Sequence, residues 1–245
     1  TSRPSCLPAL TTGLVYWTGA SPRIGATRRG FAVAGGVCWA AVPVARSPIP
    51  PPEPRVEHGW EVSARRSTAA LTLADASPLS KVVVRAPVGG AVREALGTSF
   101  GRAVRRDLGS LGRVLVIGAG PGEWLVVDRP GRGPELAAAL RTTAAATGEF
   151  ASVVDLTHGR ALVRLTGRAA PDVLAKLCAV DLSAFVTPDG AAFRTSVAGV
   201  VTDVVRDDHP DRADERSYLL HCERSSGRYL FDVLLDAGAE FGIDV

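Results

Sequence analysis

The 245-residue sequence predicts an α+β protein in which helices pack on one face of an antiparallel sheet. Two observations predict this class. Short runs rich in Val and Leu, typical of strands, follow one another across turn signals such as the TPDG at 187–190. Segments 134–147 and 225–235 instead place apolar residues at helical spacing. From 150 to 238 the predicted order is strand, strand, helix, three strands and helix.

Residues 1–66 differ in composition from the rest of the chain. They hold nine of the 17 prolines, and the prolines between 50 and 54 favour an extended polyproline II conformation. We therefore expect 1–66 to be a disordered arm rich in Pro and Arg, or upstream sequence from a mis-assigned start, and 67–245 to be the folded domain. An alternative stays open, because Arg28 and Arg29 precede a run of small apolar residues, as in a twin-arginine export signal.

Charge and cysteine usage exclude several classes of protein. The net charge of +3 comes from 1–66, where eight Arg and three Glu give +5 and leave −2 for the remainder. The body therefore lacks the basic face of a nucleic-acid-binding protein. No apolar run reaches the roughly 18–20 residues that span a membrane. The four cysteines have no metal-ligand spacing, and Cys178 and Cys222 fall in apolar segments, which favours reduced thiols and a cytoplasmic location.

The first part of the body begins with a Val-rich strand, Lys81 to Arg85. Residues 89–106 predict a helix or an irregular loop, because Gly97 and Gly101 interrupt the pattern. The arginines of this segment either meet an acidic partner or lie on a solvated surface, as charge runs usually do. They are Arg93, Arg102, Arg105 and Arg106.

The segment 113–128, RVLVIGAGPGEWLVVD, is similar to the start of a dinucleotide-binding motif. Glu123 stands where that motif needs a third glycine. The next residues, 124–127, are strand formers, whereas the motif requires a helix whose amides hold the pyrophosphate. We therefore predict a hairpin without a nucleotide site. After it, Pro134 opens a helix rich in Ala and Leu that ends at Gly148.

The stretch 152–181 predicts a strand, a turn, a second strand and a helix. We expect the two strands to form a hairpin, with Gly159 at positive φ in the turn. Pro171 begins the helix. Further on, 193–205 reads as two short strands around Ala198-Gly199, 207–216 as a charged loop and 217–222 as a strand. A helix then follows, capped by Ser225 or Ser226, with an apolar stripe of Leu230, Phe231, Leu234 and Leu235.

Several blocks between Leu71 and Gly242 resemble glycine-cleavage aminomethyltransferases, and among that superfamily the gamma subunits of heterotetrameric sarcosine oxidase. One block is GPGEWL at 120–125. The other is VVDLTHGRALVRLTGRAAPDVLAKLCAVD, whose matching positions are Asp155, Thr157, His158, Gly167, Ala170, Leu174, Leu177 and Asp181. The resemblance implies a folate-binding-domain-like fold that lacks the C-terminal barrel of aminomethyltransferases.

The resemblance also implies a function. Such complexes oxidatively demethylate sarcosine to glycine, formaldehyde or 5,10-methylenetetrahydrofolate, and hydrogen peroxide. FAD, FMN and NAD belong to the alpha and beta subunits, zinc to the delta subunit, and tetrahydrofolate accepts the one-carbon unit. The gamma chain is expected to bind no cofactor, to have no catalytic residue and to pack against the alpha subunit. Whether sarcosine or another N-methyl amino acid is the substrate stays open.

One residue is a weak candidate for a folate site. Asp203 falls on the second Asp of the family's GGIIDD block, which handles the folate-bound amine. The chain departs from the family at four neighbouring positions: Thr202 for Asp, Ala198 for Gly, Phe193 for Tyr, and Cys222 near an Asn. Because only part of the family's folate-binding residues is present, folate chemistry is disfavoured. A stand-alone folate-binding one-carbon protein is nevertheless the alternative function.

Other candidates concern contacts. His158, in a predicted turn after Asp155, is expected to be structural or exposed rather than a general base. The four histidines have no spacing that suits a metal. For an assembly subunit, the candidate interface anchors are Trp124, Phe185 and Phe193.

Overall fold

The structure is a computed structural model and describes residues 28–33, 36–41, 44–65, 67–211 and 214–245. It divides into two compact units, residues 1–44 and 45–245. In the first unit, β1 (Arg28–Val33) pairs antiparallel with β2 (Gly36–Ala41). Arg28 and Arg29 thus lie in a strand, while the beginning of the predicted arm, 1–27, falls outside the described residues.

The second unit begins earlier than the sequence predicts. In it, β5 (Trp60–Ser63) pairs parallel with β3 (Ala45–Arg46) and antiparallel with β4 (Pro54–Glu57). Ile49 and Trp60 are buried. The interpretation of residues 45–65 as part of a disordered arm therefore does not agree with the structure. These two large apolar side chains are buried against the body, and their burial offsets the loss of conformational entropy when the segment becomes ordered.

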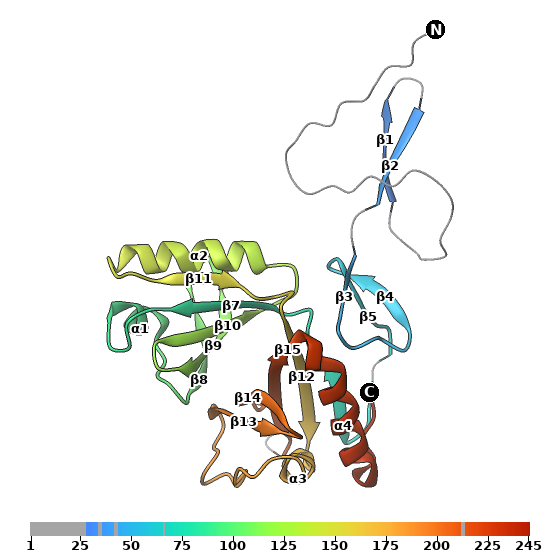
Figure 1. The fold of residues 1–245 in the computed structure, drawn as a ribbon, viewed down its shortest axis with the longest axis vertical. Helices are drawn as coiled ribbons and strands as arrows, with labels where there is room; N and C mark the ends of the chain where they lie inside the picture. Colours follow the sequence, from blue (N-terminus) through green and yellow to red (C-terminus); the bar gives the residue numbers. More distant parts are fainter. Residues whose placement is uncertain (1–27, 34–35, 42–43, 66, 212–213) are drawn as a thin grey trace. The chain divides into compact units, whose positions relative to one another are not determined.

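A first five-stranded antiparallel sheet has the order β11-β7-β10-β9-β8. Helices α1 and α2 cover one of its faces (Figure 1). Its elements, with the 3-10 turn η1, are β7 (Ser80–Arg85), α1 (Ala91–Leu96), β8 (Ala103–Asp107), η1 (Gly109–Leu111), β9 (Arg113–Gly120), β10 (Glu123–Asp128), α2 (Gly133–Ala146) and β11 (Ser152–Asp155).

A second five-stranded antiparallel sheet has the order β13-β14-β15-β12-β6. Helices α3 and α4 pack on one of its faces. Its elements, with two 3-10 turns, are β6 (Leu71–Asp75), β12 (Arg160–Gly167), α3 (Ala170–Ala175), β13 (Ala192–Val197), β14 (Val200–Arg206), β15 (Arg216–Glu223), η2 (Arg224–Ser226), α4 (Gly227–Gly238) and η3 (Ala239–Phe241).

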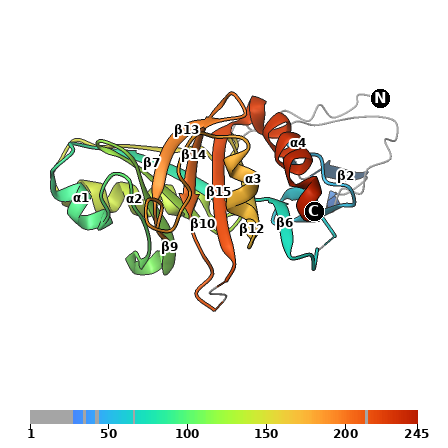
Figure 2. The same ribbon diagram turned by 90° about the horizontal axis from the view of Figure 1, so that it is seen from below.

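The two halves of this unit share one topology. In each, a strand leads to a short helix, three strands that form a meander, and a longer helix. β7 corresponds to β12, and β10 to β15. The faces without helices pack against each other, so the sheets lie between two layers of helices (Figure 2). The core between the sheets consists of Val83, Ala103, Leu115, Ile117, Leu125, Val127, Leu162, Ala192, Val205 and Leu219.

This arrangement confirms an α+β protein with antiparallel sheets and helices on one face of each. The hairpin 113–128 is confirmed as β9 and β10, with Gly122 at φ 70 in its turn. The helix 134–147 is confirmed as α2, and the pair of strands within 193–205 as β13 and β14. The stripe of α4 packs on the second sheet as expected, but Ser226 makes no capping hydrogen bond through its side chain.

The predicted hairpin within 152–166 is wrong. β11 pairs with β7 in the first sheet, whereas β12 pairs with β15 and β6 in the second. The connecting turn explains this, because the Lys81 N–H donates to Thr157 Oγ1 at 3.0 Å and the Leu156 N–H donates to the Lys81 carbonyl at 2.8 Å. The chain therefore continues along β7 instead of reversing, and Gly159 does not adopt positive φ.

Candidate functional site

Asp203, the folate-site candidate, lies in β14 between two strands that supply its partners. It pairs in register with Arg194 of β13 and with His221 of β15. Arg194 Nε donates to Oδ1 at 2.6 Å and Arg194 Nη2 to Oδ2 at 3.1 Å. The ring nitrogen Nδ1 of His221 lies 3.3 Å from Oδ2. Both carboxylate oxygens therefore have partners within the chain.

The ion pair extends across to the first sheet. Arg194 Nη2 lies 3.5 Å from Glu123 Oε1, and Glu123 Oε2 accepts a hydrogen bond from Arg85 Nε at 2.8 Å. The resulting series of alternating charges joins β13 and β14 to β10 and β7. Asp203 is thus part of a contact between the two sheets.

Burial and charge act in opposite directions at this cluster. Burial raises the pKa of the Asp203 carboxyl, but hydrogen bonds and charges from His221 and Arg194 outweigh it, so the net pKa lies below the usual value. Burial also lowers the pKa of His221, more than Asp203 raises it. The imidazole is therefore neutral at pH 7 and donates its Nδ1–H to Asp203. Its Nε2 is buried, and no described residue is within hydrogen-bond reach of it.

These observations test the folate interpretation. A carboxylate that handles a bound amine needs an oxygen available to the ligand, and it should be able to change its protonation state. Asp203 is 13% exposed in its side chain and is held ionised by two partners of the same sheet. The arrangement does not fit a folate site, and we derive no chemical step at it.

His158 lies on the surface of the turn between the two sheets, where its ring stacks on Trp60 with centroids 4.7 Å apart and an interplanar angle of 4°. The neighbouring Asp155 carboxylate accepts the Thr157 N–H at 2.9 Å. The structure thus agrees with a structural, exposed His158. The sequence alone does not indicate this contact, because Trp60 belongs to the segment 1–66 that it predicts to be a disordered arm.

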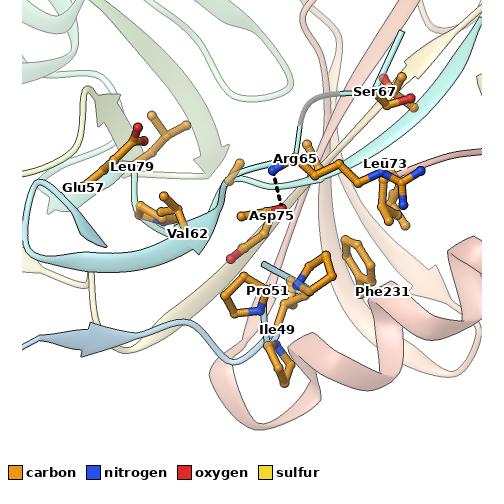
Figure 3. Close-up of a pocket in the computed structure, with 18 of the residues that line it drawn as sticks. Ile49, Pro51, Glu57, Val62, Arg65, Ser67, Leu73, Asp75, Leu79 and Phe231 are labelled. Atoms are coloured by element: carbon orange, nitrogen blue, oxygen red, sulfur yellow. Dashed lines mark hydrogen bonds between the residues drawn. The ribbon is translucent and has the colours of Figure 1, made fainter. Parts of the chain in front are cut away.

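A pocket of about 430 Å³ lies between the β3–β5 segment and β6 (Figure 3). Ile49 and Pro51 form one side with Phe231 of α4, and Glu57 and Leu79 lie on the opposite side. None of the candidate residues predicted from the sequence lines it. Sequence reasoning could not find this pocket, because one of its walls was assigned to a disordered arm.

The three predicted interface anchors have different environments. Trp124 is only 2% exposed, and its indole N–H donates to the Thr98 carbonyl at 3.0 Å. It cannot serve as an exposed anchor, since α1 and its own sheet already cover it. Phe193 is half-buried against the core of the second sheet. Phe185 is 95% exposed and stays a candidate anchor.

In the part of the chain that the structure describes, no group of three or more His, Cys, Asp or Glu side chains is placed to hold a metal ion. Cys178 and Cys222 are free thiols, and burial raises the pKa of Cys222 to about 11. No helix of the described residues has both the length and the apolar character needed to cross a bilayer.

Comparison with solved structures defines the class of fold. The chain superposes on the glycine-cleavage aminomethyltransferase T of Bartonella henselae with a TM-score of 0.58 and 16% identity, over 78% of this chain and 55% of that one. Heterotetrameric sarcosine oxidase from Corynebacterium sp. U-96, in complex with pyrrole 2-carboxylate, gives a TM-score of 0.58 and 24% identity, over 74% of this chain and 89% of that chain. The fold is aminomethyltransferase-like.

Sequence comparison identifies the family. The sarcosine oxidase subunit gamma of Corynebacterium sp. (strain P-1) is 33% identical over 190 residues, which cover 76% of this chain and 89% of the relative. The subunit of the same name from Arthrobacter sp. is 34% identical over 151 residues, or 59% of this chain and 71% of the relative. No family model matches the chain. The chain belongs to the sarcosine oxidase gamma-subunit family.

Proposed function

We propose that this chain is a non-catalytic gamma subunit of a heterotetrameric sarcosine oxidase and that its role is assembly. The observation that supports this most is the 33% identity over nearly the whole of a gamma subunit. The structure adds that the one candidate carboxylate, Asp203, is engaged by Arg194 and His221. Such a residue stabilises the contact between the sheets and offers no oxygen to a substrate.

In this proposal the alpha, beta and delta subunits are the partners. The complex oxidatively demethylates sarcosine to glycine, and FAD, FMN, NAD, zinc and tetrahydrofolate bind to the partner subunits. We further propose a cytoplasmic location, supported by the free thiols of Cys178 and Cys222. We also propose that the fold lacks the aminomethyltransferase barrel, supported by a match to 89% of a gamma subunit and to 55% of an aminomethyltransferase.

The experiment is a pull-down of the tagged full chain from a host that co-expresses the neighbouring subunits. We expect the larger subunits in the eluate, together with flavin absorbance, whereas the chain expressed alone is colourless. A stand-alone folate-binding protein would behave differently. It would elute without partners and would bind tetrahydrofolate in a titration monitored by calorimetry, and this result would refute the proposal.

A further inference from the structure

The arginines of the second unit are not paired uniformly. Among the described residues of 45–245, most arginine side chains bind a carboxylate or a backbone carbonyl. Arg105, one of the four arginines of 89–106, belongs to this majority, because it donates to both oxygens of Asp207 at 2.9 and 2.6 Å. In the same described part of the chain, five arginine side chains have neither an ion pair nor a hydrogen bond: Arg93, Arg102, Arg106, Arg113 and Arg141.

Three of these five lie close together in the chain, on or after α1. Arg93 is on α1 itself. Arg106 lies in β8 with its guanidinium against Gly97, so close that a Cβ added at Gly97 would meet Nη1 at 1.4 Å. Arg102 precedes β8, and the alternation of side chains along a strand places it on the same face as Val104 and Arg106. The side chain of Val104 packs toward α1 and α2. By contrast, Arg113 stands opposite Asp107 in register.

A hollow of about 230 Å³ adjoins this segment. Ser99, whose carbonyl accepts the Arg102 N–H at 3.2 Å, is one of its lining residues. Arg93 forms part of its wall, and Trp124 is its buried floor. Val88 and Phe100 also line the hollow, although each is 60% exposed. Interface hot spots cluster in pockets that become fully desolvated on binding, and Arg is one of the residues enriched there.

Two glycines fix the shape of this hollow. A Cβ at Gly118 would lie 2.0 Å from the Ser99 carbonyl oxygen, so the loop before Phe100 rests directly on β9. Gly122 has φ +70, and a Cβ there would lie 2.4 Å from the Ala86 carbonyl oxygen. The segment before α1 and the tip of the β9–β10 hairpin are therefore in close backbone contact. The hollow is therefore preorganised, and binding a ligand does not require its walls to become ordered.

The local charge is positive, because three arginines outnumber two acidic residues. Glu149, the nearest acidic residue that contacts α1, accepts the backbone N–H groups of Ala91 and Val92 at 2.8 and 2.9 Å. Glu94 is the one acidic side chain on α1. Three guanidinium groups thus exceed the local acidic charge, and carboxylates on a partner would complement them. A nucleic acid fits less well, because nucleic-acid binding draws its affinity from many Lys and Arg contacts to phosphates, and this surface offers three arginines.

We propose that this surface, which we call the Phe100 face (Val88, Arg93, Phe100, Arg102 and Arg106), docks an acidic segment of another sarcosine oxidase subunit. One apolar side chain of that segment fills the hollow above Trp124, and its carboxylates bind the arginines. The inference rests on the proposed function, since it needs a partner subunit.

The test uses the full tagged chain, co-expressed with the neighbouring subunits, in two variants of the face. Phe100→Ser removes the apolar rim, and Arg93→Glu combined with Arg102→Glu reverses two charges. We expect each variant to bind the partner at least tenfold more weakly, as measured by co-purified partner and by titration. The charge-reversed complex should also lose most of the salt dependence of binding shown by the original chain.

Matched controls lie outside the face. Phe150→Ser removes an aromatic ring that is more exposed than Phe100, and Arg141→Glu reverses an unpaired charge on α2. Both should bind as the original chain does, and thermal melts should show all four variants folded. If the face variants bind as tightly as the controls, the Phe100 face is not the docking surface, although the proposed function stands.

Two further outcomes would overturn the proposal in different ways. If the unaltered chain captures no subunit, the proposed function fails together with the inference. If the unaltered chain binds a labelled DNA duplex and the charge-reversed variant does not, the face belongs to a nucleic acid and not to a partner subunit.

Discussion

At the scale of single residues, Asp203 shows that a match to a family motif does not by itself establish the function of a residue. Its position in the sequence matches a residue that handles a folate-bound amine in aminomethyltransferases. Its neighbours in space, Arg194 and His221, make it the centre of an ion pair between strands. A motif position alone therefore does not preserve a role when the surrounding side chains change.

Asp203→Asn tests this assignment. We expect the free energy of unfolding to fall by about 1–3 kcal/mol, because His221 and Arg194 lose their charged acceptor. Sarcosine-dependent peroxide formation per assembled complex should be unchanged. Asp236→Asn, at an exposed position of α4, is the control and should alter neither quantity. Normal assembly of the Asp203 variant with a large loss of turnover would contradict a structural role.

Lys81 is the second informative residue. Its side chain is fully buried, and Nζ donates to the carbonyls of Ser77 and Leu79 at 2.6 and 2.7 Å. Burial lowers its pKa from 10.5 to about 8, against the attraction of Asp75 and Asp155. Between these two values the unfolded chain binds a proton that the folded chain does not, so this residue makes stability rise with pH.

We expect Lys81→Met to remove that dependence. Relative to the variant, the original chain should gain up to about 3 kcal/mol of unfolding free energy as the pH increases from about 8 to 10.5. Urea denaturation at several pH values measures both chains, and the raised pKa of Cys222 affects them equally. A difference between the two chains that is constant with pH would show that Lys81 does not titrate in this window.

At the scale of elements, local patterns predicted most strands and helices, because each is specified by residues near in sequence. Turn residues fixed the β9–β10 hairpin, and Pro134 fixed the start of α2. Sheet membership could not be predicted in this way. β11 and β12 are neighbours in sequence, yet the hydroxyl of Thr157 and the backbone of Lys81 direct them into different sheets.

The same limit applies to the candidate sites. The sequence predicts that the arginines of 89–106 either meet an acidic partner or lie on a solvated surface. Only the structure separates Arg105, which binds Asp207, from the three that have no partner among the described residues. Likewise, the sequence shows that Trp124 is aromatic, but not that the chain buries it. Both distinctions depend on residues far apart in sequence.

The β9–β10 turn provides a prediction at this scale. Gly122→Ala should lower the free energy of unfolding by about 1–3 kcal/mol, because Ala tolerates positive φ poorly and its Cβ would strike the Ala86 carbonyl. Gly89→Ala is the control, since no atom of the described residues lies within 4 Å of its Cβ position. Urea midpoints measure both variants, and equal midpoints would contradict the turn geometry.

At the scale of the whole molecule, residues 45–65 belong with the body. Trp60 is buried and stacks on His158, and Ile49 joins the core of the second sheet. A chain that begins at residue 67 should therefore unfold at lower temperature than one that begins at residue 45, because both side chains are lost. Differential scanning calorimetry compares the two chains, and equal melting temperatures would restore the boundary at 66.

The two halves of the second unit repeat one topology and share a core, so this unit has a layer of helices on the outer face of each sheet. Much of the charge at those surfaces is neutralised within the chain, and the Phe100 face is an exception.

The central claim is that this chain is a subunit whose role is assembly. The most direct measurement is size-exclusion chromatography with light scattering and flavin absorbance, on preparations of the neighbouring subunits with and without this chain. We predict one flavin-containing complex that includes the chain, and incomplete assembly when the chain is omitted. A role in assembly would be contradicted if the other subunits formed a complete, active flavoprotein complex without this chain, and if the chain, when added, eluted alone.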